Sequence, residues 1–71
     1  MSAASKFACK VAGKVREIRE DNNITQERLA KDCEVNTKTI GRIERGERDV
    51  TVGLLKKIAD ALGEDIKKFL V

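Results

Sequence analysis

The sequence predicts an all-α fold, a compact single domain of five short helices formed by the 71 residues. Three observations favour this fold class. Apolar residues recur at helical spacing along the chain, residues typical of helix caps interrupt them at short intervals, and proline is absent. Because 41% of the residues are hydrophobic but only two are aromatic, we expect a core built from aliphatic side chains.

The first helix is expected at residues 5–21. Its apolar residues are spaced by three or four positions and therefore share one helical face: Phe7, Val11, Val15 and Ile18. Asn22 and Asn23 follow, and asparagine tolerates the left-handed conformation that often ends a helix. The helix should therefore stop there.

Two short helices are expected next, at residues 26–33 and 37–45. Thr25 and Asn36 are suitable N-caps, and Gly46 is a suitable stop for the second helix. Two short helices joined by a turn of about four residues are typical of a helix-turn-helix, in which a small residue such as Ala30 lets the helices cross closely. Five apolar side chains are placed to anchor this corner, with Val35 buried in the turn itself: Leu29, Cys33, Val35, Ile40 and Ile43.

Two further helices are expected at residues 52–62 and 66–70. Thr51 and Asp65 are their predicted caps, and Gly63 is the predicted stop between them. The apolar residues of the helix at 52–62 form one stripe: Val52, Leu55, Ile58, Ala59 and Leu62. The helix at 66–70 carries Ile66, Phe69 and Leu70. The last residues, Phe69, Leu70 and Val71, are candidates either for closing this core or for a dimer interface.

The helix at 37–45 is basic on the side opposite its apolar residues. At about 100° per residue, one face collects Ile40, Ile43 and Glu44, and the opposite face collects Lys38, Arg42 and Arg45. Any amphipathic helix has a solvated face, so this stripe alone assigns no function. The net charge of +3 likewise permits a nucleic-acid partner without establishing one.

Several classes of function are disfavoured by composition. The chain has no histidine, no tyrosine and no carboxylate cluster, so neither an enzyme nor a metal or other cofactor is expected. Cys9 and Cys33 lack metal-site spacing and are expected to be small apolar fillers in a reducing compartment. No apolar run is long enough for a signal peptide or a membrane helix, so we expect a cytoplasmic protein with no membrane partner.

Three motifs stand at fixed intervals: "ITQERLA" at 24–30, "TIGRIERG" at 39–46 and "KKIADALG" at 56–63. In this combination the chain resembles the Cro/phage-repressor helix-turn-helix family, also called the XRE family, over about residues 11–70. The resemblance implies a lambda-repressor-like domain that binds double-stranded DNA as a transcriptional regulator. It further implies a homodimer on a palindromic operator, with helix 37–45 in the major groove. The alternative is a protein-interaction module, such as an antitoxin that neutralises a partner toxin.

The resemblance also implies roles for individual residues. Those matching base-reading positions are Thr37, Lys38, Gly41 and Arg42. Those matching phosphate-binding positions are Gln26, Asn36, Thr39, Arg45 and Gly46. Arg19 and Glu44 match a partly buried ion pair between the first and third helices. For Gly41, close approach of the helix to the groove floor and simple helix packing are both open.

Two departures from the family pattern stand out. Glu34 occupies a turn position where the family usually has glycine, because the backbone there adopts positive φ, and glutamate should cost on the order of 1 kcal/mol. The run "RDVTV" at 48–52 lacks the proline found in many members. In this it resembles the small controller proteins of restriction–modification systems.

Overall fold

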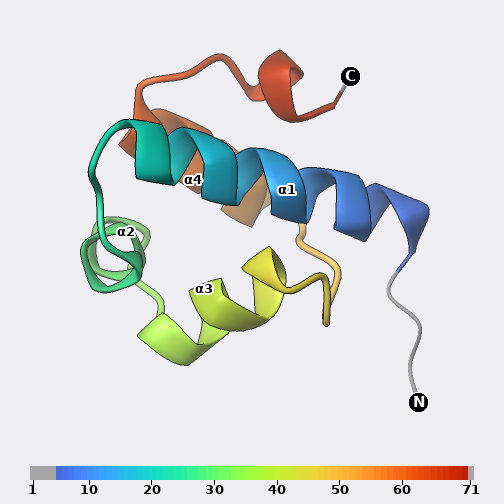
Figure 1. Ribbon diagram of the computed structural model, residues 1–71, viewed down its shortest axis with the longest axis horizontal. Helices are drawn as coiled ribbons and strands as arrows, with labels where there is room; N and C mark the ends of the chain where they lie inside the picture. The colour runs from blue at the N-terminus through green and yellow to red at the C-terminus, as the bar shows by residue number, and fades with distance from the viewer. Residues whose placement is uncertain (1–4, 71) are drawn as a thin grey trace.

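The computed structural model describes residues 5–70, which form four α-helices and one short 3-10 helix. The elements are α1 (Lys6–Asp21), α2 (Gln26–Asp32), α3 (Thr37–Glu44), α4 (Val52–Leu62) and η1 (Ile66–Phe69). α1 crosses the middle of the molecule with α4 behind it, while α2 and α3 lie on the side away from η1 (Figure 1). α1 packs against α3, α4 and η1, and α2 packs against α3 and α4.

The helix boundaries follow from local capping. Each element begins after a side chain that accepts a hydrogen bond from a backbone N–H of the first turn. These capping residues are Ser5, Thr25, Asn36, Thr51 and Asp65. The four predicted caps are therefore confirmed, and Ser5 caps the first helix. Gly46 and Gly63 have φ values of 70°, and Asn23 has a φ of 57°, so the predicted stops adopt the left-handed conformation.

The core is aliphatic apart from one phenylalanine. Its fully buried large side chains come from all five elements and the corner: Val11, Val15, Leu29, Cys33, Ile40, Ile43, Leu55, Ile58 and Phe69. Ala30 is 2% exposed in this cluster. Phe69 therefore closes the core rather than lying on the surface, whereas Val71 is outside the described residues.

The prediction of a fifth α-helix is wrong. The segment Ile66–Phe69 is a 3-10 helix of four residues, closed by the hydrogen bond from Leu70 N to Lys67 O at 3.0 Å. A turn this short makes too few i→i+4 bonds to repay the ordering of its backbone, so its stability comes from packing. The buried ring of Phe69 provides that packing.

Two residues predicted to face inward are exposed instead, and so is Leu70, for which the sequence leaves core closure and a dimer interface open. Phe7 is 43% exposed, Val52 is 77% exposed and Leu70 is 46% exposed. Each lies at an end of its element, in the first turn of α1, at the first position of α4, or just after η1. Helical spacing extends an apolar stripe to the end of a helix, but the neighbouring elements do not cover those end positions.

The two cysteines differ in environment. Cys33 is fully buried, as predicted for a small filler, and burial raises the pKa of its thiol. Cys9 is exposed on α1, so the same prediction is wrong for it. None of the helices in the described part of the chain has the length and hydrophobicity of a membrane-spanning segment.

Two glycines, one inside the fourth helix and one that caps its C-terminus, should respond oppositely to alanine. A Cβ at Gly53, inside α4, would meet nothing within 4 Å, so Gly53→Ala should raise the free energy of unfolding by about 0.5–1 kcal/mol through helix propensity. Gly63 has a φ of 70°, so Gly63→Ala should lower it by about 1 kcal/mol. Urea titrations would measure both, and equal effects would contradict the prediction.

Candidate nucleic-acid interface

The corner between α2 and α3 is a helix C-terminus followed at once by a helix N-cap. Glu34 N donates to Lys31 O at 3.1 Å, and Val35 N donates to Ala30 O at 3.0 Å. This pair of bonds is a Schellman motif, in which the residue after the cap must be left-handed. Glu34 takes that role with a φ of 60°. Val35 is half-buried against the core rather than fully buried, so it anchors the corner only in part.

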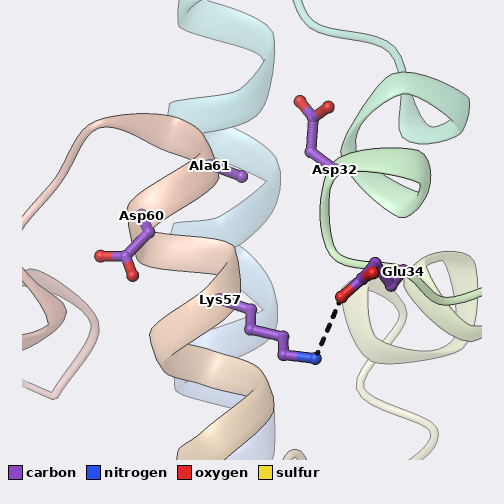
Figure 2. Close-up of a pocket in the computed structure, with 5 residues that line it drawn as sticks. All are labelled: Asp32, Glu34, Lys57, Asp60 and Ala61. Carbon is purple, nitrogen blue, oxygen red and sulfur yellow. Dashed lines mark ion pairs between the residues drawn. The ribbon is translucent and has the colours of Figure 1, made fainter.

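Glu34 also contacts the fourth helix. Its carboxylate lies 3.7 Å from the ammonium group of Lys57, across an open hollow of about 350 Å³ beside α4 (Figure 2). Asp32 and Asp60 line the same hollow, but their carboxylates point away from this ion pair. Among the described residues, no group of three ligating side chains could hold a metal ion. The hollow therefore offers an exposed ion pair and no metal site.

The strained position of Glu34 gives a stability prediction. Glu34→Gly should raise the free energy of unfolding by about 1 kcal/mol, because glycine adopts a positive φ without steric cost. Glu34→Ala keeps the strain and removes only the exposed ion pair with Lys57, so it should stay within about 0.5 kcal/mol of the wild type. Urea denaturation of both variants decides the matter. A glycine variant no more stable than the alanine variant would show that the backbone at residue 34 is unstrained.

An ion pair fixes the third helix to the first. Arg19 donates to Glu44 through two parallel bonds, Nε to Oε2 at 2.7 Å and Nη2 to Oε1 at 3.0 Å. Its Nη1 donates to the carbonyl of Ile24 at 2.7 Å. The side chains of Arg19 and Glu44 are only 11% and 2% exposed. The hydrogen bond with Glu44 raises the pKa of Arg19 above its ordinary value.

Gln26 joins the second helix to the same carboxylate. Its Nε2 donates to Glu44 Oε1 at 3.0 Å, so Glu44 receives bonds from both α1 and α2. The carboxylate is buried on the inner side of α3, next to Ile40 and Ile43. The orientation of α3 is therefore fixed by a network of charged and apolar contacts on one side only.

The other side of α3 faces solvent. The side chains of Thr37, Lys38 and Arg42 are exposed, as is Arg45 at the C-cap. At the start of the helix, Asn36 Oδ1 accepts bonds from the backbone N–H of Thr39 at 2.9 Å and from its hydroxyl at 3.0 Å. The cations thus follow one open edge of a rigid helix, and Asn36 and Thr39 cap its beginning.

Gly41 lies beneath Arg45. It is buried, and a Cβ added there would lie 3.0 Å from Arg45 Nη1 and 3.7 Å from Gln26 Oε1. Of the two interpretations left open by the sequence, this placement favours packing, because the missing side chain makes room for the guanidinium group. A contact between Gly41 and a base would require Arg45 to move.

Glu47 is the residue that the sequence interpretation missed. Its carboxylate accepts two bonds from Arg45, from Nε at 2.8 Å and from Nη2 at 3.2 Å. The available signal was its position, two residues after Arg45 at the C-terminus of α3, where the helix dipole disfavours an acid. Gly46 lies between them with a φ of 70°, packed next to Cys9.

The helix-turn-helix family profile matches residues 15–69, which include all four α-helices in part or whole. The chain belongs to the helix-turn-helix family. It is a DNA-binding transcriptional regulator, and the XRE-family resemblance predicted from its motifs is confirmed.

Two relatives of the chain are control proteins. The chain is 43% identical over 58 residues to control protein C.BamHI of Bacillus amyloliquefaciens, covering 80% of this chain and 72% of that one. It is 40% identical over 60 residues to control protein C.SmaI of Serratia marcescens, covering 84% and 71%. The crystal structure of the restriction–modification controller protein C.AhdI from Aeromonas hydrophila superimposes with a TM-score of 0.84 at 29% identity, covering 87% and 94%.

Proposed function

We propose that the chain is a sequence-specific regulator that inserts α3 into the major groove of a palindromic operator, as a control protein of the restriction–modification type. One observation carries this proposal: α3 is fixed by the buried carboxylate of Glu44 on one side and presents exposed cations on the other. An α-helix fits the major groove, and an edge of this kind has access to it. The similarity to two control proteins supports the type of regulator.

Base recognition is assigned to three exposed side chains of α3. Arg42 and Lys38 can donate to the O6 and N7 acceptors of guanine, and Arg42 can do so with two bonds. Thr37 can place its methyl group against thymine or its hydroxyl on a base edge. Gly41 is proposed to act by seating Arg45, since no side chain of its own can reach a base.

Phosphate contacts are assigned to groups whose donors remain open. Gln26 uses one N–H on Glu44 and keeps a second for a phosphate oxygen. Asn36 uses its carbonyl oxygen as a cap, which leaves its NH₂ group for the same purpose. The hydroxyl of Thr39 donates to Asn36 and would have to rotate to serve a phosphate. Arg45, the C-cap of α3, and the backbone at Gly46 lie at the C-terminal end of that helix, opposite the end that holds Asn36 and Thr39.

Dimerisation is proposed because one copy is small. The described domain measures 30 × 25 × 21 Å, so it can read only a few base pairs of one half-site. Two copies related by a two-fold axis would read half-sites about one turn of DNA apart, roughly 34 Å. Among the described residues the exposed large apolar side chains are Phe7, Val52 and Leu70. Since Phe69 is part of the core, the proposed contact at the C-terminal end of the chain and the fourth helix would use Leu70 and Val52.

Selection of bound duplexes from a random DNA pool tests this function. The expected result is a motif made of two inverted half-sites, each with at least one guanine at the position read by Arg42. A pool that shows no enrichment, together with binding to a protein partner that is insensitive to salt, would replace the proposal with a protein-interaction function.

A further inference from the structure

We propose that Glu47 is an intramolecular competitor of DNA: its carboxylate occupies the guanidinium edge of Arg45 that a backbone phosphate would bind, and thereby sets the affinity and salt dependence of the protein. Glu47 can act in this way only if α3 binds DNA as proposed above. Its carboxylate is a chemical counterpart of a phosphate, since both accept two parallel bonds from one guanidinium group.

The backbone holds Glu47 in this position. Glu47 N donates to the carbonyl of Arg42 at 2.9 Å, and Gly46 N donates to the carbonyl of Ile43 at 3.0 Å. With the left-handed Gly46, these bonds form a Schellman motif at the end of α3. The side chain of Glu47 therefore leaves the chain at a fixed point beside the cationic edge.

Arg45 is held from two sides. Glu47 takes its Nε and Nη2 groups at 2.8 and 3.2 Å, while its Nη1 lies over Gly41, where a Cβ would be only 3.0 Å away. The guanidinium group thus lies along α3 near the amide oxygen of Gln26, at the side of the helix where a phosphate contact is proposed. A phosphate that approaches this guanidinium group meets a cation that is already paired. It also meets a carboxylate that is negatively charged, as the phosphate is.

Glu47 is charged under ordinary conditions. The hydrogen bond from Arg45, together with the positive charges of Arg45 and Arg42, holds the pKa of Glu47 below its usual range. The carboxylate is therefore paired with Arg45, one of the cations assigned to DNA. The helix dipole does not favour this charge, because a negative charge at a helix C-terminus is opposed by the dipole.

Two consequences follow for binding. The Arg45–Glu47 pair must open, or share its guanidinium group, before Arg45 can contact a phosphate, which weakens binding. The carboxylate also cancels one cation at the interface, so fewer counterions are released when the complex forms. Removing the charge of Glu47 should therefore strengthen binding and make it more dependent on salt.

The test is Glu47→Gln, measured by fluorescence anisotropy on a duplex recovered by selection and on a random-sequence duplex. We expect Kd to fall about two- to fivefold at about 0.1 M salt, the scale of one exposed ion pair. The slope of log Kd against log salt should steepen by up to about 0.9, the value for one further phosphate.

Asp60→Asn is the matched control. Asp60 forms an exposed ion pair with Lys56 on α4 at 2.8 Å, so this variant makes the same change in net charge and loses a pair of the same length. It should move Kd less than Glu47→Gln. Repeating Glu47→Gln in an Arg45→Ala background separates competition for Arg45 from a general effect of net charge. Without Arg45 there is no guanidinium group to compete for, so the gain in affinity should disappear.

The outcomes separate the inference from the proposed function. A Glu47→Gln variant that binds as the Asp60→Asn control does, binds more weakly than the wild type, or keeps its gain without Arg45 would overturn the role of Glu47. If the wild type bound neither duplex, or bound with no dependence on Arg42, the proposed function would fall and this role with it.

Discussion

Replacing Arg19 by alanine should lower the free energy of unfolding by about 3–5 kcal/mol, the effect of leaving one partner of a buried ion pair alone. The side chain of Glu44 is 2% exposed and would lose both bonds from Arg19. Gln26 would remain its one donor, and an amide cannot neutralise a buried carboxylate. The carbonyl of Ile24 would lose its bond from Arg19 Nη1 as well.

Urea denaturation followed by circular dichroism measures this loss. A domain of 71 residues has only a few kcal/mol of stability, so Arg19→Ala can leave the chain unfolded in the absence of denaturant. Arg19→Lys is the second variant, because it keeps the charge, loses the two-bond geometry and should retain part of the stability. Lys56→Ala removes one partner of an exposed pair and should cost much less stability than Arg19→Ala.

The paired replacement distinguishes a specific contact from general electrostatics. In the Arg19→Met, Glu44→Leu double variant no buried charge is left unpaired, so it should be more stable than either single variant. A loss from Arg19→Ala no larger than that from Lys56→Ala would mean that the pair contributes little. In that case the apolar contacts of Ile40 and Ile43 alone would orient α3.

The Arg19–Glu44 pair matters for function because it fixes the orientation of α3. Glu44 is the point at which α1, α2 and α3 are joined by hydrogen bonds. Its burial turns the opposite side of α3, with Lys38 and Arg42, toward solvent. Weakening this junction should reduce DNA binding even where no DNA-contacting residue is changed, because base contacts require a fixed orientation of the helix.

Local rules predicted most of the fold. The caps Thr25, Asn36 and Thr51 were readable because N-cap chemistry depends on a single side chain and the amide three residues ahead. The apolar faces were readable where a helix is covered along its length. Phe7 and Val52 were placed wrongly because helical spacing carries no information about where a neighbouring element ends.

The hydrogen bonds and ion pairs around the site were harder to predict from the sequence than the fold. The pairing of Arg19 with Glu44 spans 25 positions, so the family resemblance suggested it and the residue pattern alone did not. The placement of Gly41 under Arg45, and of Glu47 beside it, depends on side-chain directions at the end of a helix. A helical wheel predicts the face of the helix on which a residue lies, but it does not predict which partner the side chain contacts.

Arg42→Ala should weaken binding to the selected operator by about 1–3 kcal/mol and relax the preference at one base pair of each half-site. The side chain of Arg42 is exposed on α3, so its removal should leave the fold intact. Arg42→Lys retains the charge but not the two-bond geometry, and it should recover affinity better than it recovers base preference. Gln26→Ala should instead weaken binding evenly across sequences, since its proposed partner is a phosphate.

Anisotropy titrations on operator duplexes carrying each base at the read position separate these variants. For Arg42→Ala, the loss should be largest on the preferred base and small on the other three, which brings their affinities together. If Arg42→Ala bound all four duplexes as tightly as the wild type, the cationic edge of α3 would not be the reading surface. A uniform loss on all four would place Arg42 at a phosphate, leaving Lys38 and Thr37 to read the sequence.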